Sequence, residues 1–255
     1  MQTRIKTAEE IEAMRKGGKV LAGALKALEA FVKPGITGKQ IDEFTENYIK
    51  DHGMTPGFKG YRGFPGTVCL CINDVVVHGI PNSNQIIRDG DIVTIDCGVI
   101  YQGLYTDSAV TYIIGNAPEE TVKFVKKVQK ALYEGIKQIK PGRRLGDIGH
   151  TIEKAVKKEG YHIVRELVGH GIGEHLHEDP HVPNFGKKNT GMALKPGMTF
   201  AIEPIVGLET GEIKTLKDGW TIVTPDRSLS CQWEHTVLIT HNGYEILTLR
   251  EGEKL

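Results

Sequence analysis

The sequence predicts an α/β protein of the α+β type, in which two similar halves each contain two helices followed by antiparallel strands. A half-repeat without gaps predicts the two halves, because the segment 32–35 (Val-Lys-Pro-Gly) recurs 107 positions later as 139–142 (Ile-Lys-Pro-Gly). Helical spacing of apolar residues and clusters of β-branched residues predict the mixed composition. We expect one domain over residues 1–255, with repeats at about 1–115 and 116–255, because neither half would easily bury a core alone.

Capping residues and apolar spacing predict four helices. Thr7 and Glu10 match a capping box at the start of the first helix, and Thr37 with Gln40 begins the second. Pro118 begins the third helix, since proline fits the start of a helix. The predicted helices cover about residues 7–33, 37–53 and 118–141, and the segment that follows up to about residue 160.

The segments Thr67–Val77 and Ile92–Ile114 are predicted strands. A hairpin turn centred between Tyr101 and Gln102 would place Asp96 directly opposite Asp107. Side chains so paired have Cβ atoms about 4.5–5.5 Å apart, and two aspartates at that distance repel unless cations lie between them. A bulge at Gly103 would shift this register by one residue.

The second half of the chain carries a matching pair of acids. The offset of 107 positions aligns Asp96 with Glu203, and Glu234 begins a segment that resembles the one after Asp107. An insertion of about 20 residues in the second hairpin, which contains Trp220, accounts for the longer spacing there. Two divalent cations would balance the four carboxylates.

The ten histidines include one that could complete such a site. His170 is flanked by small residues in Gly-His-Gly-Ile-Gly, which lets a ligand approach closely. The same stretch can be a simple turn, and it lacks the Lys-Ser/Thr ending of a phosphate loop. His175 and His177 would share a strand face and could form a zinc pair. A histidine taken alone is more often a surface residue or a satisfied structural residue than a ligand.

Bulk properties exclude several classes of protein. The 32 basic and 32 acidic residues cancel, so there is no electrostatic case for binding nucleic acid. The absence of a long apolar run and of a signal-peptide pattern predicts a cytoplasmic protein without a membrane segment. Cys71, Cys97 and Cys231 lie in apolar stretches without metal-binding spacing and are predicted to be buried, reduced thiols.

Several separated motifs together resemble type I methionine aminopeptidases over nearly the whole chain. They are Asn-Asp…His-Gly-Ile-Pro (73–81), Asp-Gly-Asp…Asp (89–96), Thr-Asp (106–107), Gly-His-Gly-Ile-Gly…His-Glu (169–178), Ile-Glu-Pro (202–204) and Gln-Trp-Glu-His-Thr (232–236). The resemblance implies the pita-bread fold, with two pseudo-symmetric halves around a curved antiparallel sheet flanked by helices. That expectation agrees with the repeat found in the sequence itself.

The resemblance also implies a role for individual residues. Asp107 and Glu234 would bridge two metal ions, Glu203 would also move a proton, and His78 and His177 would contact the substrate. The implied metal ligands are Asp96, Asp107, His170, Glu203 and Glu234. The implied pocket for the methionine side chain is lined by Tyr61, Phe64, Cys69, Leu176 and Trp220. Phe64 and Leu176 depart from the usual family pattern, which has Tyr and Phe at these places.

The implied activity is metal-dependent removal of the N-terminal methionine from peptides and nascent proteins that carry a small second residue. Two divalent ions, cobalt, manganese, iron or zinc, would serve as cofactors, since oxygen ligands with one imidazole suit all four. The expected protein is a cytoplasmic monomer that works near the ribosome and binds neither nucleic acid nor membrane. The alternatives are an Xaa-Pro peptidase of the same fold, which usually has a large extra N-terminal domain, and a pita-bread binding protein without catalysis.

Overall fold

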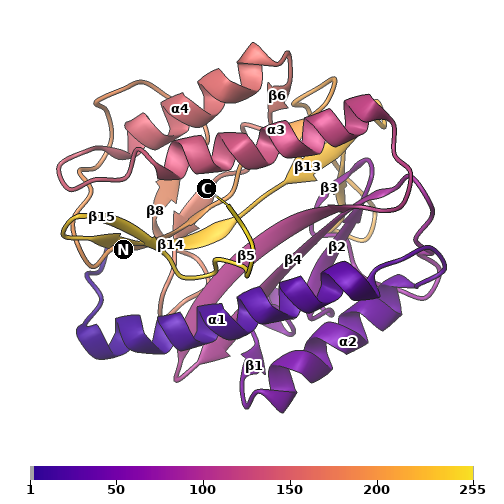
Figure 1. Ribbon diagram of the computed structural model, residues 1–255, viewed down its shortest axis with the longest axis horizontal. Helices are drawn as coiled ribbons and strands as arrows, with labels where there is room; N and C mark the ends of the chain where they lie inside the picture. The colour runs from indigo at the N-terminus through magenta and orange to yellow at the C-terminus, as the bar shows by residue number, and fades with distance from the viewer. Residues whose placement is uncertain (1–2, 255) are drawn as a thin grey trace.

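The computed structural model describes residues 3–254, and its four helices form two pairs. In Figure 1 the pair α1 and α2 lies below and the pair α3 and α4 lies above, with strands between them. Their bounds are Ala8–Phe31, Gly38–Asp51, Glu119–Ile136 and Leu145–Lys158. All four helices were predicted, but the third ends at Ile136, earlier than expected, and turns follow at residues 137–138 and 141–142.

The predicted capping boxes begin the first two helices. The Thr7 hydroxyl accepts a hydrogen bond from the backbone N–H of Glu10 at 3.3 Å, and the Glu10 carboxylate accepts one from the Thr7 N–H at 2.7 Å. Thr37 and Gln40 repeat the arrangement at the start of α2. Each box satisfies donors that the first helical turn leaves free, which fixes where the chain enters the helix.

The strands pair antiparallel throughout the described residues. One sheet has the order β1-β4-β2 with β5 on β4, and another has the order β15-β14-β9-β7-β8. Two smaller sheets have the orders β13-β10-β6 and β11-β12-β3. The bounds are β1 Thr55–Pro56, β2 Val68–Ile72, β3 Val75–Val77, β4 Ile92–Tyr101, β5 Leu104–Ile113, β6 His162–Ile163, β7 Gly169–Gly171, β8 Glu178–Val182, β9 Thr199–Ile202, β10 Ile205–Gly207, β11 Lys214–Thr215, β12 Ile222–Val223, β13 Ser230–Gln232, β14 His235–Thr240 and β15 Gly243–Ile246.

The sequence repeat reappears in the structure at the same offset. Helices α2 and α4 begin and end 107 positions apart, and so do strands β1 and β6. The glycines at 35, 53 and 90 have positive φ, and so do those at 142, 160 and 197. Glycine adopts this backbone conformation without steric cost, so the repeat preserves the same turns in both halves.

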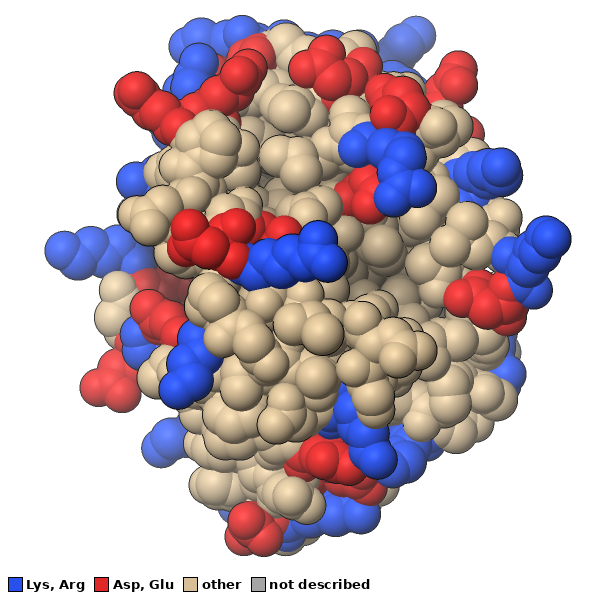
Figure 2. All heavy atoms as spheres, turned by 90° about the vertical axis from the view of Figure 1, so that its right-hand side faces the viewer, with Lys and Arg blue, Asp and Glu red and all other residues tan. Residues whose placement is uncertain are grey.

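A large apolar core lies between the helices and the sheets. It includes Leu25 of α1, Ile95 of β4 and Phe124 of α3, all fully or almost fully buried. All four cysteines are buried and free, as predicted for Cys71, Cys97 and Cys231. No helix within residues 3–254 is long and apolar enough to cross a membrane. Figure 2 shows acidic and basic side chains interspersed around a hollowed centre on the face that it draws, without a large patch of one charge there.

Candidate metal centre

The two acids of the first half lie on one hairpin, in a register that differs from the predicted one. Asp96 on β4 pairs with Ala109, and Asp107 on β5 pairs with Gly98. The prediction that the two aspartates lie directly opposite each other is therefore wrong, and so is the shift by one. The turn consists of Gln102 and Gly103, both with positive φ, which is typical of a tight two-residue hairpin turn. This turn moves the pairing by two residues, so the two acids remain on one face as diagonal neighbours.

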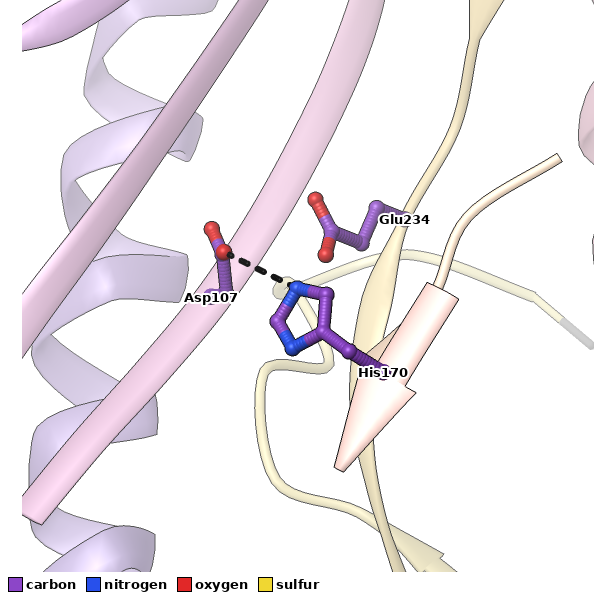
Figure 3. Close-up of side chains that lie close together, drawn as sticks. All are labelled: Asp107, His170 and Glu234. Carbon is purple, nitrogen blue, oxygen red and sulfur yellow. Dashed lines mark ion pairs between the residues drawn. The ribbon is translucent and has the colours of Figure 1, made fainter. Parts of the chain in front are cut away.

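The second half contributes two acids and a histidine. Glu203 directly follows β9, Glu234 lies between β13 and β14, and His170 is the central residue of β7. Nε2 of His170 lies 3.6 Å from Oε1 of Glu203 and 4.0 Å from Oδ2 of Asp107. Figure 3 shows Asp107 of β5, His170 of β7 and Glu234 of the segment between β13 and β14 lying close together. One potential ligand atom from each of these three residues lies within 4.8 Å of the other two.

Several oxygen atoms of this cluster are buried without a hydrogen-bond partner. They are Oδ1 of Asp96, Oδ1 of Asp107 and Oε1 of Glu234. A buried polar atom without a partner is costly, and native proteins rarely leave one without a reason. Four carboxylates and one imidazole are a donor set that divalent metal ions accept. The residues therefore fit a metal centre, in which cations would take the place of the missing partners.

Burial and mutual repulsion dominate the electrostatics of the acids. Burial raises the pKa of Asp96 to about 7. Burial, and next the charge of Asp96, raise the pKa of Asp107 and that of Glu203 well above their usual values. For Glu234, burial and the charge of Asp107 raise the pKa. These acids resist ionisation in the absence of a cation, and a bound cation would favour their charged form.

His170 is arranged as a neutral ligand. Burial lowers its pKa to about 4, so the imidazole carries no charge near neutral pH. Nδ1 lies 2.9 Å from the carbonyl oxygen of Gly171, to which it donates a hydrogen bond. The lone pair is then on Nε2, the nitrogen that faces the carboxylates. Fixing the tautomer through the second nitrogen is the usual way in which proteins orient a metal-binding histidine.

One cavity of about 380 Å³ opens onto the acids, and every site residue predicted from the sequence lines it. The rings of Trp220 and Phe64 form a T-shaped pair with centroids 5.1 Å apart. The rings of Trp220 and His78 form a second T-shaped pair with centroids 6.3 Å apart. His78 has a φ of 57°, which is uncommon for a residue other than glycine and is concentrated at functional sites. Tyr61 and His177 form a hydrogen bond on the same wall. The remaining predicted members, Cys69 and Leu176, are buried.

The sequence analysis did not identify every residue that lines the cavity. Its alternative of a zinc pair formed by His175 and His177 is wrong. Phe58, Arg62 and His181 also line the cavity, and Gln232 donates a hydrogen bond to Oε2 of Glu203 at 3.3 Å. Gln232 gave a signal through its place in Gln-Trp-Glu, and His181 through its place among the histidines near Glu178, whereas Phe58 and Arg62 gave none. The proposed zinc pair fails because segment 173–177 is a bend rather than a strand, and His175 is exposed.

A second cavity of about 550 Å³ lies elsewhere, lined by residues of α1, β5, α3 and the C-terminal segment 250–253. None of the four acids and none of the predicted substrate residues lines it. The smaller cavity is therefore the candidate site, although the other is larger.

Comparisons with known proteins identify a family of metallopeptidases. The family model described as metallopeptidase family M24 matches residues 12–241. Methionine aminopeptidase 1 of Bacillus subtilis (strain 168) is 44% identical over 95% of this chain and 98% of its own length. Methionine aminopeptidase of Escherichia coli (strain K12) is 44% identical over 100% of this chain and 97% of its own length.

Solved structures give the same result. The crystal structure of methionine aminopeptidase from Thermotoga maritima superposes with a TM-score of 0.95 at 45% identity, and covers 98% of this chain and 100% of that one. Prolidase from Pyrococcus furiosus superposes with a TM-score of 0.78 at 25% identity, over 97% of this chain but 66% of its own. The pita-bread architecture is thus shared with both, and the likeness to the first is much greater.

Proposed function

The chain belongs to metallopeptidase family M24, and from this premise we propose that it removes the N-terminal methionine from peptides and nascent proteins. Similarity to methionine aminopeptidases over almost the entire length of both proteins carries the proposal. The cavity supports it, since buried acids and a neutral imidazole form one wall and aromatic and apolar residues form the other. A side chain such as that of methionine fits a pocket of this kind, in which a few polar groups set the orientation.

The proposed cofactor is a pair of divalent cations, chosen from cobalt, manganese, iron and zinc. Asp96, Asp107, His170, Glu203 and Glu234 would hold these ions. When bound, such ions act as Lewis acids and make water a stronger nucleophile at neutral pH. Two positive ions also match the formal charge of the four carboxylates.

Glu203 is the proposed proton carrier. Its Oε1 lies beside Nε2 of His170, while its Oε2 accepts a hydrogen bond from Gln232. This arrangement leaves one carboxylate oxygen facing the centre, where it can accept a proton from the attacking water. The same oxygen can then return the proton to the amide nitrogen of the leaving peptide.

His177 is proposed to stabilise the carbonyl oxygen of the bond that breaks. Burial, and next the charge of His170, lower the pKa of His177 to about 3, so its ring is neutral. Tyr61 lies 2.9 Å from Nδ1 and can donate its phenolic hydrogen there, which leaves the proton of the ring on Nε2. That N–H can donate to the oxygen as negative charge develops on it. His78, whose pKa is lowered by burial, would hold the nitrogen of the same peptide bond.

The pocket for the methionine side chain is proposed to consist of Tyr61, Phe64, Cys69, Leu176 and Trp220. Burial raises the pKa of the Cys69 thiol well above its usual value, so the group is neutral and packs as a small apolar side chain. A pocket of this character favours a long, flexible and apolar side chain. A preference for small second residues, action near the ribosome, a monomeric state and a cytoplasmic location belong to the same proposal.

The alternative of an Xaa-Pro peptidase is not favoured. The prolidase of Pyrococcus furiosus has about a third of its length outside the region that this chain covers, whereas the methionine aminopeptidases are covered almost completely. The alternative of a binding protein without catalysis is not favoured either, because all five proposed ligands surround the same cavity.

Release of methionine from a panel of Met-Xaa peptides tests the proposal, after the metal-free chain is reloaded with each candidate metal in turn. We expect release when Xaa is Gly, Ala or Ser and little release when Xaa is bulky. An Ala-Pro peptide serves as the control for the alternative enzyme. A chain that binds metal stoichiometrically and leaves every Met-Xaa peptide intact would contradict the proposal.

A further inference from the structure

Two buried hydroxyl groups bind the backbones of Asp107 and Glu234. Thr236, two residues after Glu234, binds Asp107, and Ser108, the residue after Asp107, binds Glu234. Oγ1 of Thr236 accepts a hydrogen bond from the N–H of Asp107 at 2.8 Å and donates one to the carbonyl oxygen of Asp107 at 2.8 Å. In return, Oγ of Ser108 donates to the carbonyl oxygen of Glu234 at 2.7 Å. A hydroxyl can do both, since it has one hydrogen and two lone pairs. Each acid is thus bound through a neighbour of the other, and we call Thr236 and Ser108 the hydroxyl clasp.

The hydroxyl clasp lies where the sheets of the two halves meet. Strand β5 pairs with β4 on one edge, and β14 pairs with β9 and β15 in a different sheet. Across the junction, the N–H of Glu234 donates to the carbonyl oxygen of Ala109 at 3.0 Å. In a strand the N–H and C=O of one residue point to the same side, so those of Asp107 face the junction as well. Thr236 and Ser108 are fully buried and satisfy groups that water cannot reach.

The C-terminal segment supports the hydroxyl clasp from behind. Nη1 of Arg250 donates to Oγ of Ser108 at 3.1 Å, and Oγ1 of Thr248 accepts from the N–H of Thr236 at 3.1 Å. Arg250 is buried and forms an ion pair with Glu253 at 2.5 Å, which holds its guanidinium in place. Both members of the hydroxyl clasp are therefore fixed by a third segment of the chain.

We propose that Thr236 and Ser108 are positioning residues, which fix the separation of Asp107 and Glu234 before any cation binds. The proposal rests on the proposed function, because it takes these two acids as shared metal ligands. Carboxylates gathered without a cation repel one another and would spread apart if their strands could move. The hydroxyl clasp joins the backbone of β5 at Asp107 to the backbone at Glu234. The repulsion between these two acids is therefore overcome when the chain folds, and not when metal binds. Groups that orient metal ligands in this way typically change metal affinity by about 10- to 100-fold when they are removed.

Calorimetric titration of the metal-free full chain with Mn²⁺ tests the proposal through two substitutions at one position. Thr236→Val keeps the shape of the side chain and removes the hydroxyl, whereas Thr236→Ser keeps the hydroxyl. We expect Mn²⁺ to bind Thr236→Val about 10- to 100-fold more weakly than the unchanged chain, and Thr236→Ser nearly as tightly. Excess Mn²⁺ should restore methionine release by Thr236→Val, because the residues that react are intact.

Thr45→Val is the matched control. Thr45 is also fully buried, and its hydroxyl donates to the carbonyl oxygen of Ile41 at 2.8 Å within α2, away from the acids. We expect this change to lower thermal stability without weakening Mn²⁺ binding. If Thr236→Val does not fold, Ser108→Ala carries the same test, since it removes the hydrogen bond to Glu234.

The outcomes separate this proposal from the proposed function. Equal Mn²⁺ affinities for the unchanged chain, Thr236→Val and Ser108→Ala would overturn the positioning role and leave the activity untouched. A chain that binds Mn²⁺ tightly, loses affinity on Thr236→Val and releases no methionine would support the hydroxyl clasp and contradict the proposed function.

Discussion

The phenolic oxygen of Tyr61 lies 2.9 Å from Nδ1 of His177, and the centroids of the two rings are 5.4 Å apart. Tyr61 belongs to a short 3₁₀ helix whose flanking Gly60 and internal Gly63 both have positive φ. A side chain held by such a tight turn can orient a histidine without itself reaching the reacting bond. The contact therefore predicts a role in catalysis for a residue that was expected only in the methionine pocket.

Tyr61→Phe should lower kcat about five- to tenfold with a small change in KM, because one hydrogen bond that selects the tautomer of His177 is lost while the ring remains. Steady-state kinetics with a Met-Gly peptide measure both constants. Tyr48→Phe, on α2 outside the cavity, is the control and should leave both unchanged. An unaltered kcat in Tyr61→Phe would show that the contact does not act on His177.

His170→Ala should reduce metal content and methionine release together. The substitution removes the only nitrogen among the five proposed ligands, so a cation loses one donor atom and binds more weakly. Elemental analysis of the purified chain and a peptide assay measure the two quantities. His150→Ala on α4, whose ring contacts the carbonyl oxygen of Gly186, is the control. Full activity at unchanged metal content in His170→Ala would remove this residue from the centre.

Removing the metal should make stability fall as the pH rises. An acid whose pKa is raised by folding binds more protons in the folded state, so the free energy of unfolding decreases between its unfolded and folded pKa values. For Asp96 that window runs from about 4 in the unfolded chain to about 7 in the folded one. Thermal melts of the chelated chain should show a lower Tm at about pH 8 than at about pH 5. The Tm of the metal-loaded chain should fall much less between the same two pH values, about 5 and about 8. Parallel curves with and without metal would argue against a cation among these acids.

The two capping boxes should contribute separately to stability. Thr7→Ala and Thr37→Ala each remove a hydrogen bond at the start of a helix and should each lower the free energy of unfolding by about 1 kcal/mol. Helix α1 has 24 residues and is therefore about 36 Å long, and α2 begins near its far end (Figure 1), so the effects should add in the double variant. Denaturant titration measures them, and Mn²⁺ affinity should not change. A double variant that loses much more than the sum would indicate that the helix starts are coupled.

Much of the fold could be predicted because its signals are local. Capping residues such as Thr7 and Thr37 indicate where helices begin. The repeat predicts the same turn in both halves, at residues 35 and 142. The acids could be recognised because the repeat aligns Asp96 with Glu203 and because separated motifs agree with one family. These signals need no knowledge of distant contacts.

The remaining features depend on contacts that local patterns do not encode. The hairpin register depended on whether the turn consists of Tyr101 and Gln102 or of Gln102 and Gly103, and the positive φ of Gly103 next to that of Gln102 decided it. Arg62 reaches the cavity from a single 3₁₀ turn and His181 from the five-residue strand β8, and both segments are too short for a sequence period to show the direction of a side chain. The hydrogen bonds of Thr236 to Asp107 join residues 129 positions apart, and only the tertiary structure brings them together.

The most direct test of the proposed activity is mass-spectrometric measurement of methionine release from a Met-Gly peptide while the chelated chain is titrated with Mn²⁺. The proposed function predicts no release without metal, release that rises with occupancy of the centre, and no cleavage of an Ala-Pro peptide at any occupancy. Full metal occupancy with an intact Met-Gly peptide, or cleavage of the Ala-Pro peptide in its place, would contradict it.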